Sequence, residues 1–151
     1  MLYATIVRRK VRDTFERINR GDVAAMVAGL DDPFEYRFHG EHALGGRRTS
    51  REAMARWWQR TMRLLPGLHF EVLEVLVQGP PWCTRVATRL RVSGPLPDGT
   101  RYENLAFQFL TLRWGRVRSI ETIEDLQRLT RALELVAESG VAEAAAEPIE
   151  G

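Results

Sequence analysis

Hydrophobic and polar residues alternate most clearly over residues 102–125, in the stretch YENLAFQFLTLRWGRVRSIETIED. Two runs of β-branched, aromatic and aliphatic residues flank Arg-Trp-Gly-Arg, and the glycine permits a tight reversal of the chain. The stretch therefore predicts a long β-hairpin. One face of its first strand carries two amides and an alanine, namely Asn104, Ala106 and Gln108. The other face is apolar and carries Leu105, Phe107 and Phe109. Two amides beside a small residue are suited to lining a cavity, so both faces are expected to have a role.

The residues before this hairpin predict helices and one strand. An apolar stripe at spacings of three and four predicts an amphipathic helix over residues 3–19. A short second helix is expected over residues 23–30, where Asp31-Asp32-Pro33 ends it. Strict alternation over residues 34–39 predicts a strand with Phe34, Tyr36 and Phe38 on one face. The glycine-rich stretch that follows is interpreted as a turn.

A capping box formed by Thr49 and Glu52 predicts the third helix, which is long and ends at Pro66-Gly67. Trp57 and Trp58 cannot point the same way, so one is expected in the core and the other at a helix edge or cavity rim. Two further strands are predicted over residues 68–78 and 82–93, and a closing helix from about residue 126 to 139. The predicted fold class is α+β: helices first, then a mainly antiparallel sheet that wraps them.

Length and composition narrow the classes of protein to which the chain can belong. A chain of 151 residues is long enough for one domain with a sizeable core. Cys83 is the only cysteine, which excludes an intrachain disulfide, and no Cys/His cluster has zinc spacing, so no metal site is expected. No run of apolar residues is long enough to span a membrane and no signal peptide is recognised, so a reducing, cytoplasmic location is expected.

Charge is distributed unevenly. Residues 1–120 carry 20 basic and 12 acidic side chains, whereas residues 121–151 carry two basic and eight acidic ones. Arginine outnumbers lysine 21 to 1. The arginines are scattered and have no interleaved aromatic residues, so neither a nucleic acid nor a membrane is expected as a partner.

The order of elements resembles the nuclear transport factor 2-like superfamily, in particular its SnoaL-like, ketosteroid-isomerase-related branch. The residues that carry the resemblance are Phe38-His39-Gly40, Leu44-Gly45-Gly46, Trp57-Trp58-Gln59-Arg60, Leu65-Pro66-Gly67-Leu68, Gly79-Pro80-Pro81-Trp82, Tyr102-x-Asn104, Trp114-Gly115-Arg116-Val117 and Asp125. The resemblance implies a single SnoaL-like domain over residues 1–140, followed by an acidic C-terminal tail, 141–151, that is expected to be partly docked. It also implies a cone-shaped curved sheet, a cystatin-like α+β roll, with a ligand cavity inside and a homodimer formed through the outer sheet face.

Catalytic branches of this superfamily place acidic or histidine side chains in the cavity, where the pKa of a base can move toward neutrality. This chain departs from the hydrolase-like pattern, because Thr122 stands at the position of the first acid and Asp125 is expected to cap a helix. The candidates for acid/base residues are Glu124 and His39. An oxyanion would be bound by Asn104 or Gln108. The cavity is expected to be lined by Tyr36, Phe38, Trp57 or Trp58, Asn104, Gln108, Thr122 and Glu124, with Ala106 leaving space at its centre.

The geometry of the hairpin turn decides which residues of the second strand share a face with the amides of the first. A left-handed bulge at Gly115 would pair even-numbered residues, so that Asn104, Ala106 and Gln108 share a face with Thr122 and Glu124. A two-residue turn would instead place Glu121 and Ile123 there. The bulge is the favoured hypothesis.

Three functions are compatible with the sequence. The first is the binding of a small apolar or polycyclic molecule without chemistry. The second is a cofactor-free enzyme of the cyclase or isomerase type, and the third is a dimeric scaffold with a vestigial pocket. A polar residue with a strongly shifted pKa inside a ligand-sized cavity would favour the enzyme, and a fully packed cone would favour the scaffold.

Overall fold

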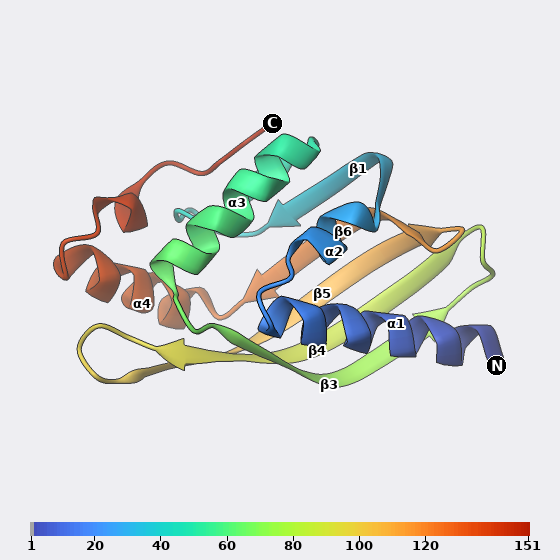
Figure 1. The fold of residues 1–151 in the computed structure, drawn as a ribbon, viewed down its shortest axis with the longest axis horizontal. Coiled ribbons are helices and arrows are strands. Elements are labelled where there is room, and N and C mark those ends of the chain that lie inside the picture. The colour runs from blue at the N-terminus through green and yellow to red at the C-terminus, as the bar shows by residue number, and fades with distance from the viewer. Residues whose placement is uncertain (1) are drawn as a thin grey trace.

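The computed structural model describes residues 2–151 as one layer of helices packed on a curved sheet (Figure 1). Met1, which belongs to the predicted 1–140 domain, lies outside the described residues. The helices are α1 (Leu2–Asn19), α2 (Ala24–Ala28), α3 (Arg51–Leu64), α4 (Leu126–Glu138) and the 3₁₀ helix η1 (Ala142–Ala145). The strands are β1 (Leu30–Phe38), β2 (Gly46–Arg48), β3 (His69–Gln78), β4 (Thr84–Pro95), β5 (Arg101–Arg113) and β6 (Arg116–Glu124).

The sheet has the strand order β2-β1-β6-β5-β4-β3. Only the β1–β6 pair is parallel within the described residues, and all other neighbours are antiparallel. Helices α1, α2 and α3 lie over one face, and α4 lies at one end of the sheet (Figure 1). The predicted fold class, an α+β roll with a curved, mainly antiparallel sheet, is therefore confirmed.

Register in the β5–β6 hairpin agrees with the favoured prediction, although its cause differs. Ala106 pairs with Glu124, and Gln108 pairs with Thr122. The turn nevertheless has only two residues, Trp114 and Gly115, both with positive φ (51° and 77°). Pairing shifts three residues later, because Thr111 pairs with Ser119 whereas Leu112 pairs with Val117. The bulge therefore lies at Arg118 in β6 and not at the turn, and it restores the even-numbered face that a two-residue turn alone would have reversed.

Some predicted boundaries were wrong. Leu30 begins β1 and does not end the second helix, so α2 is only five residues long. The stretch interpreted as a turn contains β2, which pairs with the end of β1. The cap of α3 is Ser50, whose Oγ accepts a hydrogen bond from the backbone N–H of Ala53, because Thr49 still follows the extended chain after β2.

The last helix and the chain after it close one side of the roll. Asp125 caps α4 as expected, and its carboxylate accepts hydrogen bonds from the backbone N–H groups of Gln127 and Arg128. Beyond η1, the chain continues without regular secondary structure, and its last residue meets the end of β2. There Gly151 donates its N–H to the Arg47 carbonyl oxygen and accepts a hydrogen bond from Thr49 N–H. Of the helices within residues 2–151, none has the length and apolar character needed to cross a bilayer.

Candidate functional site

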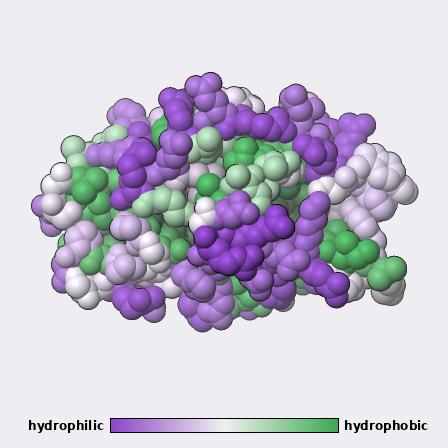
Figure 2. Space-filling model, viewed as in Figure 1, coloured by the Kyte–Doolittle hydropathy of each residue, from purple (hydrophilic) through white to green (hydrophobic). Residues whose placement is uncertain are grey.

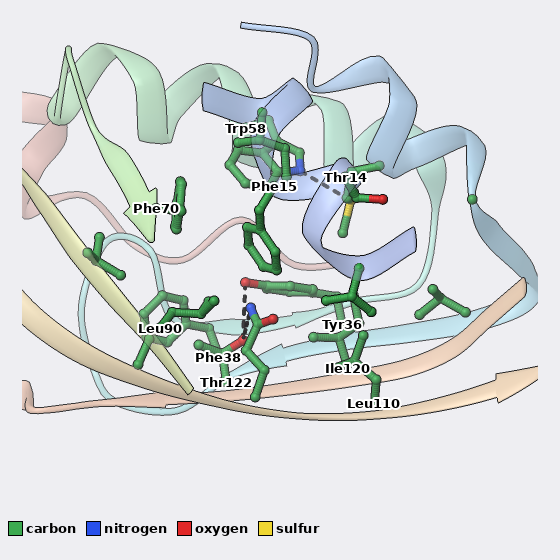
Figure 3. Close-up of a pocket in the computed structure, with 18 of the residues that line it drawn as sticks. Thr14, Phe15, Tyr36, Phe38, Trp58, Phe70, Leu90, Leu110, Ile120 and Thr122 are labelled. Atoms are coloured by element: carbon green, nitrogen blue, oxygen red, sulfur yellow. Dashed lines mark hydrogen bonds between the residues drawn. The ribbon is translucent and has the colours of Figure 1, made fainter. Parts of the chain in front are cut away.

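A pocket of about 250 Å³ lies between the inner face of the sheet and the helices. Its floor consists of inward-facing residues of β1, β4, β5 and β6, and its roof of the apolar faces of α1 and α3. Figure 3 shows Phe15 of α1 pointing from the roof toward the Tyr36 ring, with Trp58 and Phe70 beside it. Aromatic and aliphatic side chains therefore form most of the wall, which suits an apolar ligand.

Most of the residues predicted to line a cavity do line this pocket. They are Tyr36, Phe38, Trp57, Trp58, Ala106, Gln108, Thr122 and Glu124. Both tryptophans are buried, and their rings pack edge to face with 4.8 Å between the ring centroids. The expectation that one of them would lie at a rim was therefore wrong. Each indole finds a separate acceptor: Trp57 Nε1 donates to the Leu44 carbonyl oxygen, and Trp58 Nε1 points to Met26 Sδ.

Asn104 lies on the correct face of β5 but does not line the pocket. Its side chain is buried, and its Nδ2 donates to the Tyr102 hydroxyl oxygen at 2.8 Å and to the Asp125 carbonyl oxygen at 3.0 Å. These partners satisfy the amide within the protein, because this part of β5 lies beneath the start of α4. Contrary to the prediction, Asn104 is thus not among the residues that line the pocket, and its amide contacts the Tyr102 hydroxyl instead.

His39 lies outside the pocket, on the opposite side of the sheet. It follows Phe38 by one residue, so the alternation of β1 directs it outward, toward Glu121 of β6. Its Nε2 lies 3.1 Å from Glu121 Oε1, a close contact without the geometry of a hydrogen bond. His39 therefore cannot act as an acid or base on a molecule in this pocket.

Glu124 is the one carboxylate that lines the pocket within the described residues. Its side chain is half-buried. The Tyr102 hydroxyl donates to Glu124 Oε1 at 2.6 Å. Burial raises the pKa of Glu124 to about 7, against the opposing effect of this hydrogen bond. Near neutral pH the carboxyl group is thus present in both its protonated and its ionised form.

A second polar group lies beside Glu124 on the pocket floor. Gln108 Nε2 donates to Thr122 Oγ1 at 3.2 Å, and Thr122 Oγ1 lies 3.5 Å from the Tyr36 hydroxyl, as the dashed lines in Figure 3 show. If Thr122 accepts from Gln108 and donates to Tyr36, the hydroxyl hydrogen of Tyr36 remains free for a ligand. Burial raises the pKa of Tyr36 to about 12, so this phenol stays a hydrogen-bond donor at neutral pH.

Sequence reasoning missed two residues that support the site. Tyr102 lines the pocket and has the same parity as Ala106 and Gln108, so the alternation of β5 contained the signal for it. Arg48 lies behind the wall, fully buried, with its guanidinium 5.2 Å from the centre of the Tyr36 ring and 5.3 Å from that of Trp57. Burial lowers the pKa of Arg48 to about 10. A buried arginine in a strand of three residues has no sequence signal that would have revealed it.

Within residues 2–151, no three His, Cys, Asp or Glu side chains gather as ligands for a metal ion. His42 is held in the loop after β1, where its Nδ1 accepts from Leu44 N–H and its Nε2 lies 3.0 Å from the His39 carbonyl oxygen. Both ring nitrogens are occupied by the backbone, and burial lowers the pKa of His42, which favours the neutral ring.

Comparison with known proteins agrees with this architecture. The family model of the SnoaL-like domain matches residues 11–120. Bal32a, from a soil-derived mobile gene cassette, has a TM-score of 0.73 and 21% identity, over 85% of this chain and 97% of its own. A protein from Jannaschia sp. CCS1, described as a SnoaL-like polyketide cyclase, has a TM-score of 0.69 and 18% identity, over 85% and 91% of the two chains. PrhC from Penicillium brasilianum NBRC 6234 has a TM-score of 0.75 and 14% identity, over 91% of each chain. At these identities the likeness shows the fold alone. No curated protein sequence matches significantly.

Proposed function

The chain belongs to the SnoaL-like domain family of the nuclear transport factor 2-like superfamily, and from this premise we propose that it is a cofactor-free acid/base enzyme. Its substrate would be an apolar small molecule that carries a carbonyl group and binds in the pocket. The observation that carries the proposal is the position of Glu124, a carboxyl group in an apolar pocket with a pKa of about 7. A general base is most effective when its pKa lies near the working pH.

The chemistry that these residues support is proton transfer at carbon. Ionised Glu124 would remove a proton from the carbon beside the carbonyl, and the electron pair of the broken C–H bond would move onto the carbonyl oxygen to give an enolate. Tyr36 would donate its free hydroxyl hydrogen to that oxygen. The Tyr36 hydroxyl lies 3.5 Å from Thr122 Oγ1, and Thr122 is on the same face of β6 as Glu124, so the donor and the base both face the pocket.

Two outcomes are then open to the enolate. Return of the proton from Glu124 to a different carbon would complete an isomerisation. Attack of the enolate on a second carbonyl carbon of the same molecule would form a ring, and the proton would pass to the new alkoxide. The neighbour described as a SnoaL-like polyketide cyclase shares the fold and supports a cyclase-type reaction in this pocket.

The direct test uses Glu124→Gln, which keeps a hydrogen-bonding side chain and removes the charge that accepts a proton. Wild-type protein is expected to exchange the hydrogens beside the carbonyl in a panel of apolar ketones and diketones for deuterium, as measured by NMR in D2O. The variant should lose roughly 100-fold or more of that rate and still bind N-phenyl-1-naphthylamine, a neutral fluorescent probe. Glu121→Gln, on the outer face, is the matched control and should leave the rate unchanged. Equal rates for wild type and Glu124→Gln would overturn the assignment.

Binding without chemistry is the second candidate, and the predominantly apolar wall favours it. Both functions require the pocket itself. Ala106 is buried on its floor, between Leu90 of β4 and Glu124 of β6. Ala106→Leu would fill this space and is expected to weaken probe binding by about tenfold or more, while the free energy of unfolding changes by less than about 2 kcal/mol.

The control for this substitution is Ala87→Leu, which adds the same atoms to the neighbouring strand β4 outside the pocket lining. Probe fluorescence and urea unfolding measure the two effects separately. If Ala106→Leu binds the probe as tightly as wild type does, the pocket is not the binding site.

A further inference from the structure

The lining of the pocket reaches the protein surface on α1, and we take this place as its mouth. Among the lining residues, only Ile6 and Lys10 are exposed, and they lie one helical turn apart on the same face of α1. Lys10 Nζ reaches across and donates to the Gly115 carbonyl oxygen at 3.0 Å. The ammonium group thus bridges helix α1 and the turn of the β5–β6 hairpin, at the mouth of the pocket.

The two charged residues that line the pocket lie at its opposite ends. Lys10 contacts the turn at Gly115, whereas Glu124 is the last residue of β6. Nine residues of strand would span about 30 Å when straight and somewhat less in this curved sheet. The pocket is therefore elongated along the hairpin, with its cation at the mouth and its carboxyl group at the far end.

In the described part of the chain, Lys10 has no acidic partner. Within residues 2–151 no carboxylate forms an ion pair with it, and its hydrogen bond goes to a neutral carbonyl oxygen. Arg8 and Arg9 precede it on α1 and add positive charge near it. A positive field at the mouth of an apolar pocket attracts anions and orients them as they enter.

From this geometry we infer that the pocket binds an elongated amphipathic anion, with the apolar chain or ring system inside and a carboxylate or similar acidic group held by Lys10 at the mouth. The inference rests on the proposed function, because it concerns the same pocket. The reverse orientation is disfavoured, since it would bring the acidic group toward the Glu124 carboxylate and leave Lys10 without an anionic partner. Lys10 is thus a specificity-determining residue that decides which end of the substrate reaches Glu124.

The test compares decanoate with 1-decanol, which has the same alkyl chain and no charge, as competitors that displace N-phenyl-1-naphthylamine. Lys10→Met keeps the apolar stem and is expected to weaken decanoate binding about fivefold, without changing 1-decanol binding. Lys10→Arg should restore decanoate binding. Arg17→Met, which removes a cation from α1 outside the pocket lining, is the matched control and should behave as wild type.

Because Lys10 is the only lysine in the chain, a direct readout is also possible. Reductive methylation with ¹³C-formaldehyde keeps the positive charge and gives one lysine NMR signal, distinct from that of the amino terminus. Decanoate is expected to shift this signal, and 1-decanol to leave it in place.

Three results would overturn the inference. Equal decanoate affinity in wild type and Lys10→Met, with the probe still bound, would remove the role of Lys10 and leave the pocket as a binding site. An equal loss of affinity for decanoate and 1-decanol in Lys10→Met would show that the lysine side chain contributes only apolar packing and not its charge. Failure of the wild-type protein to bind the probe at all would refute ligand binding in the pocket, and this inference with it.

Discussion

The Glu124 carboxyl group is held in a pocket whose wall is mostly apolar. Among residues 2–151, only the Tyr102 hydroxyl donates a hydrogen bond to it. Burial penalises the ionised form more than this one hydrogen bond favours it, so the pKa of Glu124 rises from 4.5 to about 7. A pKa that differs between the folded and unfolded states makes stability depend on pH. The property that suits Glu124 to proton transfer should therefore also be measurable in unfolding.

The sign follows from which state binds the proton. Between pH 4.5 and about 7, Glu124 is protonated in the folded protein and ionised in the unfolded chain, so its contribution to stability is complete at low pH and is lost as pH rises to about 7. Relative to wild type, Glu124→Gln should gain about 2 kcal/mol in free energy of unfolding at pH 8 and almost nothing at pH 4.5. Urea unfolding at pH 4.5 and at pH 8 measures this difference in free energy of unfolding, with Glu121→Gln as the control. A constant difference across that range would contradict a raised pKa.

At the scale of single residues, alternation along the strands predicted most of the pocket floor. Gln108, Thr122 and Glu124 face inward because the even-numbered residues of β5 and β6 share one face. The same rule directs His39 outward, since Tyr36 and Phe38 point inward, so the alternation over residues 34–39 already spoke against His39 as a pocket residue. Asn104 has the correct parity, but sequence alternation does not reveal where along a strand the pocket ends.

Among the elements, the β5–β6 hairpin combines two features that offset each other. The two-residue turn at Trp114 and Gly115 would place odd-numbered residues of β6 on the pocket face, and the bulge at Arg118 reverses this. Gly115 is recognisable in the sequence as a turn residue. Arg118 has no such signature, because a bulge of this kind depends on how the strand fits its neighbours. The sequence therefore predicted the correct pocket-facing residues of β6, although it placed the bulge at Gly115 and not at Arg118.

The C-terminal segment 141–151 contributes contacts that composition alone did not specify. Its Glu143 carboxylate accepts hydrogen bonds from Arg60 and Arg63 of α3, and the Ile149 carbonyl oxygen accepts one from the buried Arg48 at 2.7 Å. The hydrogen bond from Arg63, followed by that from Arg60, lowers the pKa of Glu143 to about 2. An acidic tail after a basic body is therefore positioned by specific arginines and is not simply a solvated end.

Deletion of residues 141–151 is expected to lower the free energy of unfolding by about 3 kcal/mol, because Arg48 would lose one of its buried acceptors. Loss of the salt bridges to Glu143 would add to this. Thermal and urea unfolding measure the change. Glu147→Gln is the control, since its backbone oxygen, and not its carboxylate, accepts from Arg60. If the truncated protein is as stable as wild type, the docked segment contributes nothing to the fold.

For the molecule as a whole, the surfaces differ in character on the two sides of the sheet. Figure 2, seen from the side of the helices, shows hydrophilic residues over much of the surface, with hydrophobic patches between them. The opposite face of the sheet exposes Leu105, Phe107, Phe109 and Ile123, each by 42–51%. These four residues are neighbours on β5 and β6, because Phe107 pairs with Ile123. A contiguous apolar row of this kind on a sheet commonly marks an interface.

We propose that this row forms the centre of a homodimer, in which each copy contributes the same surface around a two-fold axis. Phe107 lies in the middle of the row, so Phe107→Glu would place two like charges near that axis in an apolar contact. The variant is expected to be a monomer at concentrations where wild type is a dimer, a change of at least about 100-fold in the dissociation constant. Leu2→Glu, which charges an exposed apolar residue of α1, is the control and should remain dimeric. Sedimentation equilibrium or light scattering distinguishes these results, and a wild-type protein that is monomeric at micromolar concentration would refute the dimer.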